Sequence, residues 1–200
     1  MIHCIGDSHS VFFCNHDNHP NWYIHGYPNN NPIYSPFQTH WIGAHTAYNL
    51  HKRKPIFDEV IKKFWKPNDH VLFVAGEIDC REHIVKHSKL QNRTIESVAQ
   101  EACQRFFSFI SSYRQYNLIS FSAIPPTTIC SGGGDPCHIA LLSYNKELEK
   151  LANINKIPFL SIQDEIFNIP NNWYIDGTHL NPKLAIPIVL AKLKLLHIGY

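Results

Sequence analysis

The sequence has no long hydrophobic run. It lacks any stretch of about 18 uninterrupted apolar residues, so we expect no transmembrane helix. Its first ten residues, MIHCIGDSHS, contain no basic segment, no long apolar segment and no small-residue cleavage site, which excludes a typical signal peptide. Charge is also sparse: 17% of residues are charged, the net charge is +2, and the 18 basic residues are scattered. We therefore expect a cytoplasmic protein that neither spans a membrane nor binds nucleic acid.

Cysteine is sparse as well. Six cysteines in 200 residues are too few for a disulfide scaffold, and without an export signal we expect them to be reduced. Cys130 and Cys137, which flank a glycine-rich loop, are the one pair placed for a bond. Residues 14–19 (CNHDNH) include metal-binding types, but their spacing matches no standard zinc pattern. The glycines at 132–134 are not followed by the Lys-Ser/Thr of a phosphate loop, so we expect no metal and no cofactor.

The apolar content is sufficient for one core. With 200 residues and 44% hydrophobic side chains, the chain is expected to form a single domain over residues 1–200. Periodicity predicts strands at residues 1–6, 22–27, 71–75, 118–124 and 158–162, and helices at residues 43–51, 94–116 and 138–154. A last helix should begin at Pro182, with Asn181 as its N-cap. Pro187 should kink or restart the last helix. Alternating strands and helices predict an α/β fold with a parallel sheet, whose site lies at the carboxyl ends of the strands.

Two short motifs fall at this predicted edge. Residues 6–8 (GDS) follow the first strand, where a turn would present the Ser8 hydroxyl next to backbone N–H groups. Residues 176–179 (DGTH) precede the last helix, and their spacing lets Asp176 hold one imidazole nitrogen of His179 while the other faces a nucleophile. Each motif alone is more often an ordinary turn. Their common position favours a serine nucleophile with a histidine base.

A third polar group follows the strongest predicted strand. Residues 76–81 read GEIDCR and place Glu77, Asp79 and Arg81 beside the apolar core. Charged groups at such a position indicate a functional site, or else an ion pair of Arg81 with Glu77 or Asp79 that only braces the site. The sequence leaves both interpretations open.

With these motifs in place, the sequence resembles the SGNH/GDSL hydrolase superfamily over residues 3 to about 195. The resemblance implies a three-layer, flavodoxin-like α/β fold, with a central parallel sheet and helices on both faces, and it implies ester hydrolysis or acyl transfer. It assigns Ser8 as nucleophile and Asp176 and His179 as its partners in a triad. It also implies an oxyanion hole formed by the backbone N–H groups of Ser8 and Gly43.

One position departs from the family pattern. The family's G-x-N-D block here reads GEID, so Ile78 stands where an asparagine would donate a hydrogen bond to the oxyanion. Loss of one such donor typically costs about 100- to 1000-fold in turnover. Arg81 is our candidate for a substitute donor, with Glu77 and Asp79 in supporting roles.

Three functions fit this pattern. The first is a serine esterase acting on a small ester or an O-acylated glycan; the second is an O-acyltransferase that passes the acyl group to a sugar. The third is a non-catalytic module that binds a glycan or a partner, which Ile78 favours and the intact serine, aspartate and histidine oppose. Aromatic residues in the segment 22–41 would suit a sugar-binding lid or ordinary loop packing: Trp22, Tyr23, Tyr27, Tyr34, Phe37 and Trp41.

Overall fold

A six-stranded sheet forms the centre of the protein. The computed structural model describes residues 1–14, 33–123, 134–167, 174–175 and 178–199. The strands are β1 (Ile2–Gly6), β2 (Ile33–Tyr34), β3 (Phe37–Trp41), β4 (His70–Val74), β5 (Leu118–Phe121) and β6 (Phe159–Leu160). Their order is β2-β3-β1-β4-β5-β6, and every pairing is parallel except that of β2 with β3. After β1 the chain forms the strands on one side of it, β2 and β3, and then the strands on its other side, β4 to β6. This reversal makes β1 the topological switch point.

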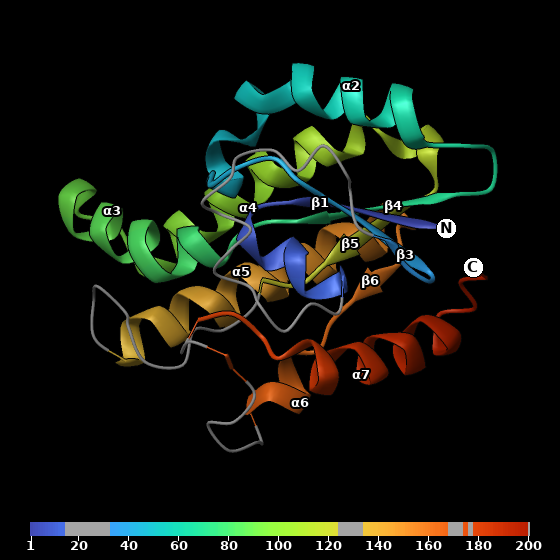
Figure 1. The fold of residues 1–200 in the computed structure, drawn as a ribbon. Helices are drawn as coiled ribbons and strands as arrows, with labels where there is room; N and C mark the ends of the chain where they lie inside the picture. The colour runs from blue at the N-terminus through green and yellow to red at the C-terminus, as the bar shows by residue number, and fades with distance from the viewer. Residues whose placement is uncertain (15–32, 124–133, 168–173, 176–177, 200) are drawn as a thin grey trace.

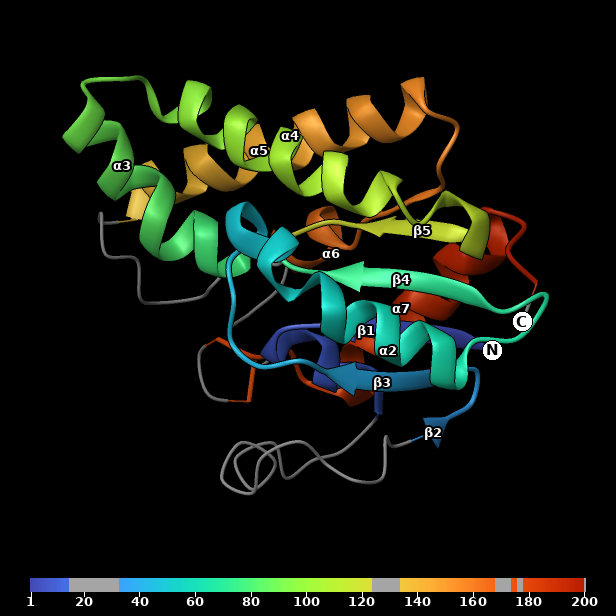
Figure 2. The ribbon, with the colours of Figure 1, turned by 90° about the horizontal axis from the view of Figure 1, so that it is seen from above.

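Helices cover both faces of the sheet (Figures 1 and 2). They are η1 (Ser8–Cys14), η2 (Ala47–Arg53), α2 (Lys54–Phe64), η3 (Asp79–His83), α3 (Ile84–Gln91), α4 (Ile95–Ser111), η4 (Arg114–Tyr116), α5 (Gly134–Ile154), α6 (Gln163–Phe167) and α7 (Pro182–Leu195). Side chains of β4 alternate between the faces: Val71 and Phe73 join the core under α2, α4 and α5, whereas Leu72 and Val74 join the core under η1, α6 and α7. The predicted three-layer α/β fold is confirmed.

Some elements were not predicted. The sequence predicts no strand at residues 37–41, where Thr39 and His40 interrupt the apolar pattern, yet both residues are buried in the core strand β3. Helix α2 was missed although Phe57, Val60 and Ile61 form its buried face, and α3 was missed too. Helix α7 runs without interruption through Pro187, which is exposed.

Other sequence-based expectations can be checked in part. Phe37 packs in the core against Phe13, so it does not belong to a sugar-binding lid. The predicted strand at 22–27 and the metal-type residues at 15–19 lie outside the described residues. No helix within the described residues has the length and apolarity needed to cross a membrane.

The expectation that all cysteines are reduced is wrong for Cys137, which is disulfide-bonded. That expectation came from the absence of an export signal, which bears on the compartment and not on which thiols lie close together. The four other described cysteines are buried and are not disulfide-bonded: Cys4, Cys14, Cys80 and Cys103. Cys130, the predicted partner, lies outside the described residues.

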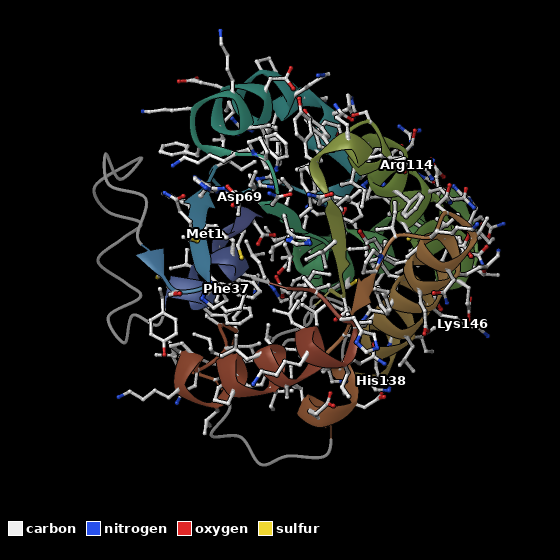
Figure 3. All side chains as sticks on the ribbon, turned by 90° about the vertical axis from the view of Figure 1, so that its right-hand side faces the viewer. Met1, Phe37, Asp69, Arg114, His138 and Lys146 are labelled. Carbon is white, nitrogen blue, oxygen red and sulfur yellow. The ribbon has the colours of Figure 1, made fainter. Side chains whose placement is uncertain are left out.

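A buried histidine pair links β1 to β3. His3 Nδ1 lies 3.0 Å from His40 Nε2, and His3 Nε2 lies 3.1 Å from a carboxylate oxygen of Asp69. The other oxygen of Asp69 is 3.2 Å from the amino group of Met1, and Figure 3 shows these two residues side by side. Burial, together with the neighbouring His3, lowers the pKa of His40 to about 3. The imidazole of His40 is therefore neutral throughout the physiological range.

This pair predicts a measurable acid sensitivity. Below pH 6.5 the unfolded chain protonates His40 while the folded chain does not, so falling pH favours unfolding. At pH 5 the effect amounts to about 2 kcal/mol. Urea unfolding of wild type and His40→Gln at pH 7 and pH 5 should show wild type losing that amount relative to the variant. If wild type and His40→Gln lost the same unfolding free energy between pH 7 and pH 5, the lowered pKa of His40 would be contradicted.

Candidate functional site

Ser8 lies on the turn that follows β1, at the switch point of the sheet. Gly6 ends the strand, and the Asp7 backbone N–H donates to Val74 O at 3.2 Å. The Asp7 carboxylate accepts the backbone N–H of His9 at 2.9 Å and so caps the first turn of η1. Burial raises the pKa of Asp7 to about 6, against the opposing influence of His9. The sequence thus folds into a rigid turn that presents the Ser8 side chain at the carboxyl edge.

His179 reaches this turn from the far end of the chain. Its carbonyl accepts the backbone N–H of Ile175 at 2.8 Å, and two residues later Asn181 caps α7 by accepting from the backbone N–H of Lys183. Helix α7 packs against η1 in the core on that face of the sheet. As a result, His179 Nε2 lies 2.9 Å from Ser8 Oγ. Asp176, the predicted third member, lies outside the described residues.

Gly43 lies on the loop that follows β3, next to the same turn. Trp41 pairs with Gly6 in the sheet, and the backbone N–H of Ile42 donates to Gly6 O at 3.0 Å. Gly43 has φ +91°, a conformation that other residues rarely adopt. Among the described residues, apart from its two chain neighbours, no atom lies within 4 Å of the place its Cβ would occupy. This position, beside the serine turn, suits the predicted role of its N–H in an oxyanion hole.

Asp79 braces the loop that carries Gly43. Its carboxylate accepts the backbone N–H groups of Ala47 at 2.6 Å and Tyr48 at 3.2 Å, at the start of η2. The side chain is 1% exposed, and this burial raises its pKa to about 7 against the two backbone hydrogen bonds. Asp79 therefore positions backbone four residues beyond Gly43.

Of the two ion pairs that the sequence left open for Arg81, the structure contains the one with Glu77. Arg81 Nε donates to Glu77 Oε1 at 2.6 Å, and the guanidinium also contacts Glu82. Glu77 is 2% exposed; its burial favours the neutral acid, but His9 and Arg81 outweigh this and lower its pKa. The two carboxylates thus hold the guanidinium of Arg81, and its role as a substitute oxyanion donor stays a prediction.

His9 directly follows the GDS motif, and the sequence alone assigns it no role. Its ring is buried and lies 4.9 Å, centre to centre, from the ring of His179, with 33° between the planes. His9 Nε2 lies 3.0 Å from Glu77 Oε2, an ion-pair contact without hydrogen-bond alignment. Burial lowers the pKa of His9, but Glu77 and Asp7 outweigh it and the net effect raises the pKa. The strand register explains this contact: Gly6 pairs with Val74, which places residues 8–9 beside residues 76–77.

The described residues support proton transfer from a hydroxyl. A serine oxygen within hydrogen-bond distance of an imidazole nitrogen can lose its proton as it attacks a carbonyl carbon. Among the described residues, no group of three or more histidine, cysteine, aspartate or glutamate side chains is arranged to hold a metal ion. The chemistry that this geometry supports is therefore nucleophilic attack by Ser8.

Similarity to known proteins is found in the three-dimensional structure and not in the sequence. No family model matches the sequence, and no curated protein matches it. Among solved structures, a member of the lipolytic G-D-S-L family from Veillonella parvula matches with a TM-score of 0.57 and 14% identity, covering 98% of this chain and 96% of that one. The acetyl xylan esterase AlAXEase matches with a TM-score of 0.56 and 15% identity, covering 98% and 100%. The chain therefore has the fold of the SGNH/GDSL hydrolases.

A third structural match is to an esterase with a catalytic aspartate and histidine at close spacing. A mutant of an acetyl-xylooligosaccharide esterase from Geobacillus stearothermophilus has a TM-score of 0.60 and 18% identity, covering 100% of this chain and 94% of that one. Two catalytic mutants of this esterase replace an aspartate and a histidine, respectively, and these two residues are three positions apart in its sequence. Identities this low show the fold alone.

Proposed function

We propose that the protein is a serine esterase in which Ser8 is the nucleophile, His179 the general base and Asp176 the residue that orients His179. The observation that carries the proposal is the 2.9 Å contact between Ser8 Oγ and His179 Nε2. These residues are separated by 171 positions and meet at the switch point of the sheet. In open parallel sheets, ligands bind at the carboxyl ends of the strands at the switch point, and this is where the contact between Ser8 and His179 lies.

The reaction follows from the geometry. Ser8 Oγ attacks the ester carbonyl carbon as its proton passes to His179 Nε2, and the oxyanion is held by the backbone N–H groups of Ser8 and Gly43. The tetrahedral intermediate then releases the alcohol, which takes the proton from His179. Water, deprotonated by His179, attacks the acyl-enzyme carbonyl carbon; His179 then returns that proton to Ser8 Oγ as the bond to the acyl group breaks and the carboxylic acid is released. Asp176 holds His179 in the tautomer that this sequence of steps requires.

The substrate class that we propose is an O-acylated carbohydrate, with a short acyl group. Support comes from the acetyl xylan and acetyl-xylooligosaccharide esterases among the structural neighbours. The aspartate and histidine altered in two of those structures have the same three-residue spacing as Asp176 and His179. Acetylated xylo-oligosaccharides are therefore the first substrates to assay, and a gain of acetyl mass on an added sugar would identify acyl transfer instead of hydrolysis.

Labelling with a fluorophosphonate tests the proposal. Intact-mass spectrometry should show one adduct on wild type and none on Ser8→Ala, because only a serine activated by a base reacts with this probe. Ser10→Ala is the matched control: Ser10 is buried, its Oγ donates to Asp7 O, and its removal should leave the adduct in place. A folded wild-type protein that takes no label would contradict the proposal and favour a non-catalytic binding module.

A further inference from the structure

His9 and Glu77 form a buried pair directly behind His179. The two side chains are each 2% exposed, and Glu77 bridges His9 on one side and Arg81 on the other. A buried carboxylate is stable only with compensating charge, so Glu77 requires these partners. On its other side the His9 ring faces His179, and its Nδ1 has no hydrogen-bond partner within the described part of the chain.

We propose that His9 is a positioning residue: its ring, held by Glu77, is the surface on which His179 rests when it meets Ser8. This inference rests on the proposed function. An imidazole that turns on its Cβ–Cγ bond loses the alignment that proton transfer needs, and a flat ring 4.9 Å away, tilted by 33°, restricts that turning. His9 thus acts on the reaction through His179 and does not touch the substrate.

The contact between His9 Nε2 and Glu77 Oε2, at 3.0 Å, gives the arrangement a second effect. A protonated His9 would place a second cationic ring 4.9 Å from His179 when His179 accepts the serine proton, which disfavours the protonated form of His179. The groups that face His9 are Asp7 from its own turn, Glu77 and Arg81 from beyond β4, and His179 from the loop before α7. Glu77 neutralises part of the repulsion, so His9 tunes the proton affinity of His179 without abolishing it.

Titration of His179 by NMR tests this inference. In protein labelled with ¹⁵N-histidine, the His179 ring signals are assigned from their loss in His179→Gln. His9→Phe keeps a flat ring but removes the basic group beside His179, so the titration midpoint of His179 should rise by about one pH unit. The control is His40→Phe, which removes a different buried imidazole and should leave that midpoint unchanged. A midpoint that is the same in His9→Phe and wild type would overturn the inference.

Labelling rates measured at a pH about two units above the midpoint that NMR gives for His179 report the positioning effect separately. His9→Phe retains the ring and should label within about 3-fold of wild type, whereas His9→Gln loses the ring and should label at least about 10-fold more slowly. His9→Gln also provides a second measure of the titration midpoint if His9→Phe does not fold. Equal rates for Phe and Gln would contradict the positioning role. Because the NMR titration requires no reactive serine, an unlabelled wild type would count against the esterase proposal alone.

Discussion

Ser8→Ala is expected to lower kcat for a simple acetyl ester by about 10⁴- to 10⁶-fold. Without Oγ no acyl-enzyme forms, and the residual rate comes only from binding and the oxyanion hole. His179→Gln should produce a loss of similar size, because Ser8 then has no base at 2.9 Å to accept its proton. The double variant should be no slower than either single one, since both residues act in the same step. Initial rates with an acetyl ester and each purified variant measure this.

Non-additive losses in kcat distinguish two residues that act together in catalysis from two that merely lie in contact. If Ser8 and His179 contributed independently, their losses would multiply and the double variant would be slower by the product of the two factors. Far-UV circular dichroism and thermal melting establish that each variant is folded. A Ser8→Ala protein that retains more than about a tenth of wild-type turnover would overturn the assignment of the nucleophile.

Gly6→Ala is expected to prevent folding, or to destabilise the protein by more than about 4 kcal/mol. A Cβ at this position would lie 2.1 Å from Val74 O and 2.8 Å from Val74 Cβ. Because the first of these atoms is backbone in the neighbouring strand, relief requires β4 to move away from β1. Soluble yield and urea unfolding at pH 7 measure the effect.

Two other glycines provide the comparison. At Gly43 no atom of another described residue, apart from its two chain neighbours, lies within 4 Å of the added Cβ, so Gly43→Ala meets only the strain of φ +91° and should cost about 1–3 kcal/mol. Gly199 likewise has no such atom within 4 Å in the part of the chain that the structure describes, and it should tolerate alanine with little loss. If Gly6→Ala were no less stable than Gly43→Ala, the close approach of β1 and β4 would be wrong.

Sequence reasoning succeeded where apolar pattern and burial coincide. The segment 71–75 is apolar on both faces and corresponds to β4, and the three-four spacing in 94–116 corresponds to α4 with its cap at Thr94. It failed at β3, where His40 is buried by pairing with another histidine. Such a partner is 37 residues away and leaves no trace in local periodicity.

The candidate site divides in the same way. Strand ends and motif spacing brought Ser8 and His179 to one edge, because parallel strands end together. The part played by His9 depends on which side chains meet between β1 and β4, and this is decided by strand register. Similarly, the sequence left open whether Glu77 or Asp79 pairs with Arg81, and the structure shows the Asp79 carboxylate bound instead to the backbone of η2.

Because Ser8 and His179 are far apart along the chain, the reactivity of Ser8 can report when the C-terminal part of the chain has docked during folding. The partners are 171 residues apart, and they meet only after α7 has docked on η1. Contacts of such long range carry a large loop-closure cost and form late in folding. During refolding, secondary structure should therefore appear before Ser8 becomes reactive, and the delay between the two signals would time one docking event.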